Sequence, residues 1–140
     1  MAYQYDNQNI FARILRGEVP CTKVHETEHS LAFNDIAPLA PDHVLVIPKG
    51  AYVTYDDFAD NASDAEIVDL TRAVSTVIQR IDADPGSGNS GYRILSNAGP
   101  DGIQMVPHYH VHIFAGRNLG AVLPVREAED IHVQAGTSAG

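Results

Sequence analysis

A chain of 140 residues with 44% hydrophobic and 19% charged residues has the size and composition of one globular domain with its own core. Its formal net charge of −9 at pH 7 repels polyanions, which excludes long DNA or RNA as the expected partner. No apolar run approaches the roughly 18 residues of a membrane span, the first residues lack a signal-peptide pattern, and the lone Cys21 allows no internal disulfide, so we expect a cytoplasmic protein.

The first half of the chain predicts one short helix and three strands. The helix begins after Asn9, a favoured N-cap residue, and ends before a glycine and a proline. Strands over 22–25 and 30–34 are joined by polar residues, which predicts a hairpin. Residues 35–41 contain two prolines and therefore predict a rigid loop, and the apolar run at 43–47 predicts the third strand.

The second half predicts a long helix and two more strands. Ser63 and Glu66 match a capping box, and apolar residues follow at helical spacing up to Ile81. Strands over 92–97 and 108–114 complete the set. Strands joined by hairpins and loops, with a long helix inserted, predict an α+β fold with a mainly antiparallel five-stranded sheet.

No repeat and no second domain is visible in the sequence. We therefore expect a single domain over residues 1–124 and a loosely ordered tail over residues 125–140, where hydrophobic periodicity is lost.

Three histidines, His108, His110 and His112, alternate with apolar residues. Because successive strand side chains point to opposite faces, an extended chain presents every imidazole on one face. The other face is then formed by Tyr109, Val111 and Ile113. Imidazole changes its charge near neutral pH, so this pattern predicts a site for nucleophilic attack, proton transfer or metal binding.

The alternation, followed by two apolar residues, resembles the histidine-triad (HIT) motif, and the likeness extends from about residue 9 to about residue 123. It is carried by Ile10-Phe11-Ala12-Arg13-Ile14, Glu18-Val19-Pro20, Leu31-Ala32-Phe33-Asn34-Asp35-Ile36, Pro41-Asp42-His43, Leu45-Val46-Ile47-Pro48, Gly91-Tyr92-Arg93 and Asn97. The chain is most similar to the nucleoside phosphoramidase branch of histidine triad nucleotide-binding proteins. This resemblance implies a HIT-like fold with one long and one short helix, and a homodimer whose sheets form one continuous sheet.

The resemblance also implies a purine nucleotide substrate, no cofactor and no metal. In the family's pattern the middle histidine attacks the α-phosphate and forms a nucleotidyl-histidine, which implies His110 as the nucleophile, with His43, His108 and His112 orienting or neutralising groups around it. The residues implied in substrate binding are Ile10, Phe11, Ile14, Phe33 and Leu45 at the base, Asp35 and Ile36 at the ribose, Asn97 at the ribose-phosphate, and Gln104 and Met105 beside the triad.

This chemistry also follows from the residues themselves. Non-bridging phosphate oxygens repel anionic nucleophiles, so a neutral imidazole with one lone pair aimed at phosphorus is well suited to attack. Flanking histidines and backbone donors can stabilise the oxygens as charge shifts. The chain departs from the family at Met105, where relatives often carry a hydroxyl or acidic residue, because a thioether cannot donate a proton.

Several other interpretations remain open. The apolar residues given to the base are also consistent with ordinary core, Asp35 with a turn aspartate, and His43 with a strand-end histidine. A dinucleoside polyphosphate hydrolase remains an alternative, because its substrate contains the same AMP half. A zinc-dependent hydrolase would use His108 with His110 or His112, with or without His43. A binding module that senses or sequesters nucleotides needs no turnover.

Overall fold

The computed structural model of the protein describes residues 2–123, and its centre is a five-stranded antiparallel sheet with the strand order β1-β2-β3-β5-β4. The elements in chain order are α1 (Ile10–Leu15), β1 (Lys23–Glu26), β2 (Ser30–Asn34), β3 (Asp42–Pro48), α2 (Tyr55–Asn61), α3 (Asp64–Arg80), a 3-10 turn (Pro85–Ser87), β4 (Tyr92–Leu95) and β5 (Val111–Ala115). The α+β class, the mainly antiparallel five-stranded sheet and the long helix are confirmed. The expected tail, residues 125–140, lies outside the described residues.

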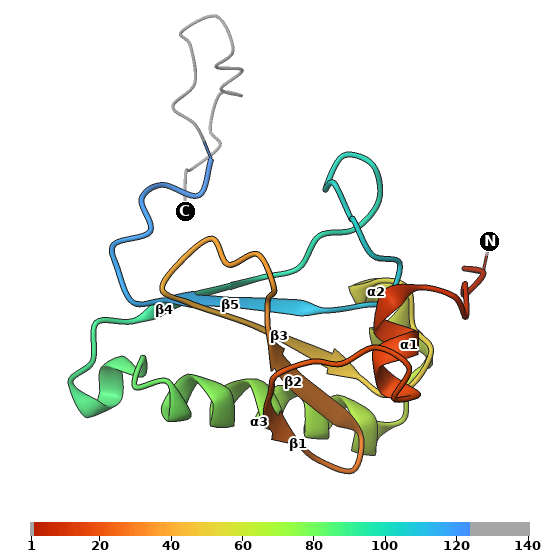
Figure 1. The fold of residues 1–140 in the computed structure, drawn as a ribbon, viewed down its shortest axis with the longest axis horizontal. Coiled ribbons are helices and arrows are strands. Elements are labelled where there is room, and N and C mark those ends of the chain that lie inside the picture. The colour runs from red at the N-terminus through yellow and green to blue at the C-terminus, as the bar shows by residue number, and fades with distance from the viewer. Residues whose placement is uncertain (1, 124–140) are drawn as a thin grey trace, which may run out of the picture.

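The long helix α3 covers one face of the sheet (Figure 1). Its N-terminus is fixed by the expected capping box, in which the Ser63 side chain accepts from the Glu66 N–H and the Glu66 side chain accepts from the Ser63 N–H. Its apolar stripe packs against alternate residues of the strands, including Val44 and Val46 of β3 and Ile113 of β5. This face therefore holds the larger core.

The opposite face of the sheet packs against α1. Asn9 caps this short helix by accepting from the Ala12 N–H, and Phe11 packs onto the alternate strand residues Leu31, Phe33, Leu45 and Ile47. Because β3 alternates between the two cores, His43 points to the same face as Leu45. The register sets Leu45 opposite His112 and His43 opposite Phe114, so these side chains share the α1 face.

The structure corrects the predicted bounds of the last two strands. The expected strands over 92–97 and 108–114 are shorter, since β4 ends at Leu95 and β5 begins at Val111. Where ladder pairing stops, the Ser96 hydroxyl donates to the His110 carbonyl at 2.8 Å, and the Tyr109 N–H donates to the Tyr52 carbonyl. A side chain and a distant loop thus replace the strand partners of the segment that carries His108 and His110.

The structure also contains a helix that the sequence analysis does not predict. Helix α2 begins after Thr54, whose side chain accepts from the Asp57 N–H, and only Phe58 is buried along it. One buried apolar residue gives no helical period, so the cap was its only signal.

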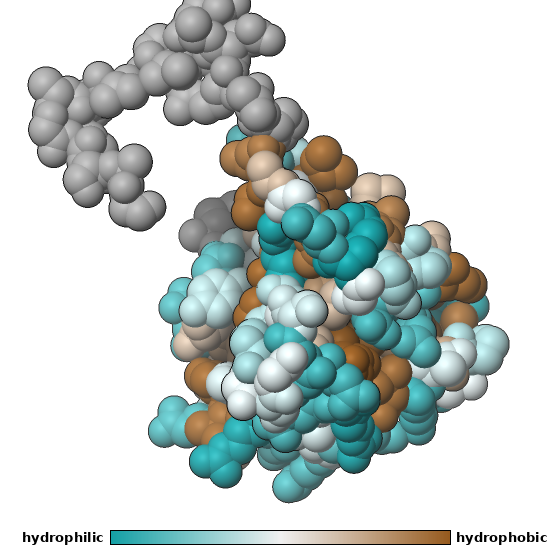
Figure 2. Space-filling model, turned by 90° about the vertical axis from the view of Figure 1, so that its left-hand side faces the viewer, coloured by the Kyte–Doolittle hydropathy of each residue, from teal (hydrophilic) through white to brown (hydrophobic). Residues whose placement is uncertain are grey.

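No helix within residues 2–123 has both the length and the apolar character needed to cross a membrane. Figure 2 shows a largely hydrophilic surface with smaller hydrophobic areas between.

Candidate active site

The three histidines of the motif lie together on the α1 face of the sheet. His108 and His110 are buried, and His112 is partly exposed. The His110 ring lies 5.0 Å from the Phe11 ring and 5.0 Å from the His112 ring, measured between centroids. Their apolar neighbours Tyr109, Val111 and Ile113 belong to the core beneath α3, so the expected division into two faces is confirmed even though β5 begins only at Val111.

The proton of His110 is fixed by a backbone carbonyl. Its Nδ1 lies 2.6 Å from the carbonyl oxygen of His108, and because a carbonyl only accepts, Nδ1 carries the hydrogen. The lone pair is therefore on Nε2. Burial lowers the pKa of His110, against the opposing effects of this hydrogen bond and of the Asp35 charge, so the ring is neutral and nucleophilic at neutral pH.

His108 is held by two groups from distant parts of the chain. Its Nε2 donates to the Pro48 carbonyl at 2.8 Å, and its Nδ1 accepts from the Tyr5 hydroxyl at 2.5 Å. Burial lowers the pKa of His108 to about 4, with a smaller contribution from the charge of His110. The neutral ring, held by two hydrogen bonds, thus anchors His108, whose carbonyl orients His110.

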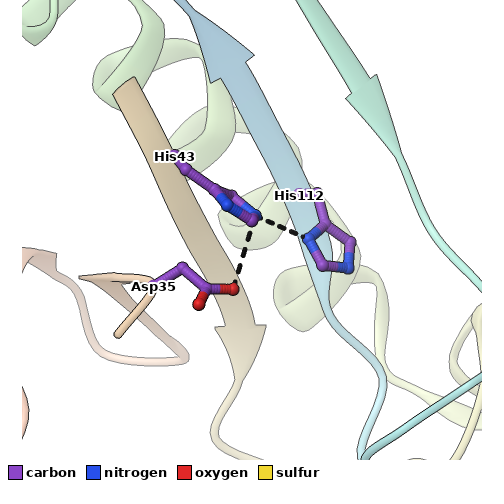
Figure 3. A group of neighbouring side chains, drawn as sticks. All are labelled: Asp35, His43 and His112. Carbon is purple, nitrogen blue, oxygen red and sulfur yellow. Dashed lines mark hydrogen bonds and ion pairs between the residues drawn. The ribbon is translucent and has the colours of Figure 1, made fainter. Parts of the chain in front are cut away.

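A second hydrogen-bond chain fixes His112 (Figure 3). The Leu39 N–H donates to Nδ1 of His43 at 3.1 Å, so the proton of neutral His43 is on Nε2. That Nε2 lies 2.9 Å from Nδ1 of His112 and 3.4 Å from Oδ2 of Asp35. Nδ1 of His112 therefore accepts, which leaves an N–H donor on its Nε2.

Both members of this histidine pair are neutral in the free protein. Burial lowers the pKa of His43, although Asp35 opposes the shift. Burial, followed by the charges of His110 and His43, lowers the pKa of His112 to about 4. A phosphate anion bound beside His112 would favour its protonated form and raise this pKa.

Asp35, His43 and His112 are also the group whose geometry suits a metal ion. Their ligand atoms all lie within 4.8 Å of one another, and two imidazoles with a carboxylate form a common ligand set. However, a metal on Nε2 of His43 would displace its proton to Nδ1, where the Leu39 N–H already donates. The hydrogen bonds therefore favour a proton chain at this position. This trio also differs from the zinc set expected from the sequence, because it lacks His108 and includes Asp35.

A cavity of about 510 Å³ lies between α1 and the sheet, within the usual size range of small-ligand sites. All the residues expected to meet the base and the ribose line it, namely Ile10, Phe11, Ile14, Phe33, Leu45, Asp35 and Ile36. Phe11 and Phe33 meet edge to face at 5.4 Å between centroids. Its lining is thus mainly apolar with one carboxylate, and Phe11, which is part of this lining, also contacts the His110 ring.

Three other residues implied in substrate binding do not line this cavity. Asn97 is partly buried in the loop after β4, and Met105 is 83% exposed. Gln104 holds the loop together, since its Nε2 donates to the carbonyls of Val53 and Val106 and its Oε1 accepts from the Gly99 N–H. The contacts of Gln104 are therefore those of a loop-stabilising residue.

Sequence reasoning did not identify three contributors to the site. Tyr5 bonds to a histidine 103 positions away, and no sequence period reports such a contact. Leu39 acts through its backbone N–H, which every residue except proline has. Val106 lines the cavity and precedes the triad by two residues, so its apolar character next to the motif was the available signal.

Comparison with known proteins agrees with this fold. Residues 16–119 match the model of the HIT domain. The chain is 59% identical over 123 residues to an uncharacterised 13.2 kDa HIT-like protein of Azospirillum brasilense, covering 88% of this chain and 98% of the relative. It is 36% identical over 116 residues to the purine nucleoside phosphoramidase of Escherichia coli (strain K12), covering 83% and 93%. A histidine triad protein from Clostridium difficile superposes with a TM-score of 0.69 at 35% identity, covering 89% of this chain and 100% of that one. The chain therefore belongs to the HIT family.

Proposed function

We propose that the protein hydrolyses the phosphorus–nitrogen bond of purine nucleoside 5′-phosphoramidates through a nucleotidyl-histidine intermediate on His110. The observation that carries this proposal is the hydrogen bond from Nδ1 of His110 to the His108 carbonyl, which leaves the Nε2 lone pair free to attack. The nucleoside-sized cavity next to Phe11 and the likeness to the Escherichia coli purine nucleoside phosphoramidase support it.

In the first displacement, Nε2 of His110 forms a bond to phosphorus as the phosphorus–nitrogen bond breaks. The electron pair of that bond leaves with the nitrogen, which must take a proton to depart as an amine. The phosphate anion favours protonated His112, and this ring gives its Nε2 proton to the departing nitrogen. His110 then carries the nucleotidyl group as an imidazolium, and His112 is neutral.

In the second displacement, a water molecule attacks phosphorus and gives one proton to the neutral Nε2 of His112. The phosphorus bond to His110 breaks, its electron pair returns to Nε2, and AMP is released. Each histidine ends in the protonation state in which it began. His43, held by the Leu39 N–H, orients neutral His112 in the free protein. Once His112 carries a proton on Nδ1, the Nε2–H of His43 faces Oδ2 of Asp35 instead. No metal takes part in this proposal.

The cavity between α1 and the sheet is proposed to hold the nucleoside. Ile10, Phe11, Ile14, Phe33 and Leu45 would enclose the flat base, Asp35 and Ile36 would meet the ribose, and Asn97 and Met105 would lie toward the phosphate and the leaving group. Apolar walls sense the shape of the ring more than its exocyclic groups, so we propose that both adenosine and guanosine nucleotides are accepted.

We also propose that the protein is a homodimer with one continuous sheet and that it acts in the cytoplasm. The dimer is supported by the exposed apolar residues Tyr92 and Ile94 on the edge strand β4. The single cysteine suits a reducing compartment.

The test is steady-state hydrolysis of adenosine 5′-phosphoramidate in the presence of a chelator. We expect the wild-type protein to be active and His110→Asn to lose activity by about three orders of magnitude or more, since the nucleophile is absent. His29→Asn, which removes a histidine beside Glu28 in the turn before β2, is the matched control and should remain active. Full activity in His110→Asn, or wild-type activity that is lost on chelation and restored by zinc, would contradict the proposal.

A further inference from the structure

The backbone around His110 lies where the regular pairing of β4 with β5 has ended. The last pair of this ladder joins Leu95 to His112, and β5 itself begins at Val111. In the described part of the chain, His110 is therefore not paired with a residue of β4. Backbone groups that leave a ladder need other partners, so the direction of the His110 ring depends on contacts outside the sheet.

Three hydrogen bonds take the place of the ladder around this residue. On the N-terminal side, the Tyr109 N–H donates to the Tyr52 carbonyl at 2.7 Å. The His110 ring is held by the bond from its Nδ1 to the His108 carbonyl at 2.6 Å. On the C-terminal side, the Ser96 hydroxyl donates to the His110 carbonyl at 2.8 Å. The proposed nucleophile is thus held before, at and after its own ring.

The bond from Ser96 differs from the other two because it requires a particular side chain. The acceptors Tyr52 and His108 act through backbone carbonyls, which every residue has, whereas the third bond needs a hydroxyl at position 96. Ser96 follows β4 directly and is exposed, and it does not line the nucleoside cavity. Its hydroxyl can therefore be removed without disturbing the core, the ladder or the nucleoside cavity.

We propose that Ser96 is a positioning residue for the reaction and that it helps to aim the Nε2 lone pair of His110 at phosphorus. Its hydroxyl fixes the peptide group that follows His110, and the His108 carbonyl fixes the ring. Together the two bonds restrict the direction of the lone pair. The rate of a displacement falls steeply when the reacting atoms are misaligned, so this restraint acts on turnover. The inference rests on the proposed function and adds a residue to its site.

The first test measures kcat and KM for adenosine 5′-phosphoramidate in Ser96→Ala, in the presence of a chelator. We expect kcat to fall about fivefold to tenfold, the scale of one lost hydrogen bond. KM should stay within about twofold of the wild-type value, because Ser96 does not line the nucleoside cavity. Ser96→Thr keeps the hydroxyl and should retain most of the wild-type kcat. Ser87→Ala, which removes a hydroxyl that bonds to Asp84 on the surface, is the matched control and should change neither constant.

The second test observes the Nδ1 proton of His110 by NMR in protein with isotope-labelled histidine and without substrate. The signal is assigned by its loss in His110→Asn. We expect this proton to exchange slowly with water in the wild type, in Ser96→Thr and in Ser87→Ala. In Ser96→Ala it should exchange several-fold faster, because the segment that carries the ring opens more often.

Equal kcat values in Ser96→Ala and Ser87→Ala would overturn the positioning role. A loss that appears mainly in KM, a threonine variant as slow as the alanine variant, or unchanged exchange of the Nδ1 proton in Ser96→Ala would overturn it as well. The proton is observed without turnover, so its outcome is separate from the proposed catalysis. A wild-type protein that hydrolyses no phosphoramidate, together with faster exchange in Ser96→Ala alone, would contradict the proposed function and support the role of Ser96 in holding His110.

Discussion

Three of the four histidines at the site have a ring nitrogen bound to a backbone group that only donates or only accepts. The carbonyls of His108 and Pro48 fix the protons of His110 and His108, and the Leu39 N–H fixes the proton of His43. The position of the three motif histidines on one face was predictable, because strand side chains have a period of two. Their tautomers were not, because they depend on backbone atoms that the fold brings from distant segments.

Tyr5 is another group that reaches the site from a distant segment, and its hydrogen bond to His108 leads to a prediction. Tyr5→Phe keeps the ring, which lies edge to face at 5.5 Å from His108, but removes the donor to a fully buried acceptor. We expect the free energy of unfolding to fall by about 1–2 kcal/mol and kcat to fall several-fold with KM little changed, since His108 positions His110. Tyr3→Phe, which breaks an exposed bond to Asp56, is the control. Equal effects of the two substitutions in urea unfolding and in kinetics would show that Tyr5 has no positioning role.

At the scale of elements, strong local signals were predicted and weak ones were missed. The capping box and apolar period of α3 gave the helix over 64–80 nearly to the residue. Helix α2 was missed because Phe58 is its one buried residue. The strand that carries the motif was predicted three residues too long at its start, because the bonds made by Ser96 and Tyr52 belong to tertiary structure.

The two edge strands of the sheet differ in a way that predicts how two copies pair. On β1, Glu26 bonds to Lys23 and Lys49, both at 2.8 Å, and the pairing with β2 contains an irregularity. Such features discourage further strand pairing. Strand β4 instead exposes Tyr92 and Ile94.

We therefore expect sedimentation to give twice the chain mass of 15.1 kDa for the wild type and a shift toward that single-chain mass for Ile94→Lys. His25→Lys, which places the same charge on β1, should stay dimeric. A wild-type monomer, or an equal effect of the two lysines, would count against pairing through β4.

At the scale of the whole molecule, the buried neutral histidines link folding to pH. Burial lowers the pKa of His108 in the folded protein from 6.5 to about 4. Between pH 6.5 and pH 4 the unfolded chain binds a proton on His108 that the folded chain does not bind. The contribution of His108 to the free energy of unfolding is therefore fully present above pH 6.5 and falls as the pH is lowered toward 4.

The loss from His108 alone should be on the order of 3 kcal/mol. His108→Gln should be less stable at neutral pH but lose less on acidification, and urea unfolding at a series of pH values measures both. A variant that remains as acid-sensitive as the wild type would show that His108 does not contribute this dependence.

The overall architecture was predictable because patterns, caps and the likeness to HIT proteins agree with one another. The position of His112 beside Leu45, which lines the cavity, follows from strand register, which no single segment of the sequence reports. The geometry supports His110 as the nucleophile, and a direct measurement can test this role.

That measurement is the intact mass of the protein after a rapid, acid-free quench during metal-free turnover of adenosine 5′-phosphoramidate, with peptide mapping of any adduct. We predict a wild-type species heavier by one adenylyl group, which is located on His110 and is missing from His110→Asn. An adduct on another residue, or continued turnover in His110→Asn, would contradict it.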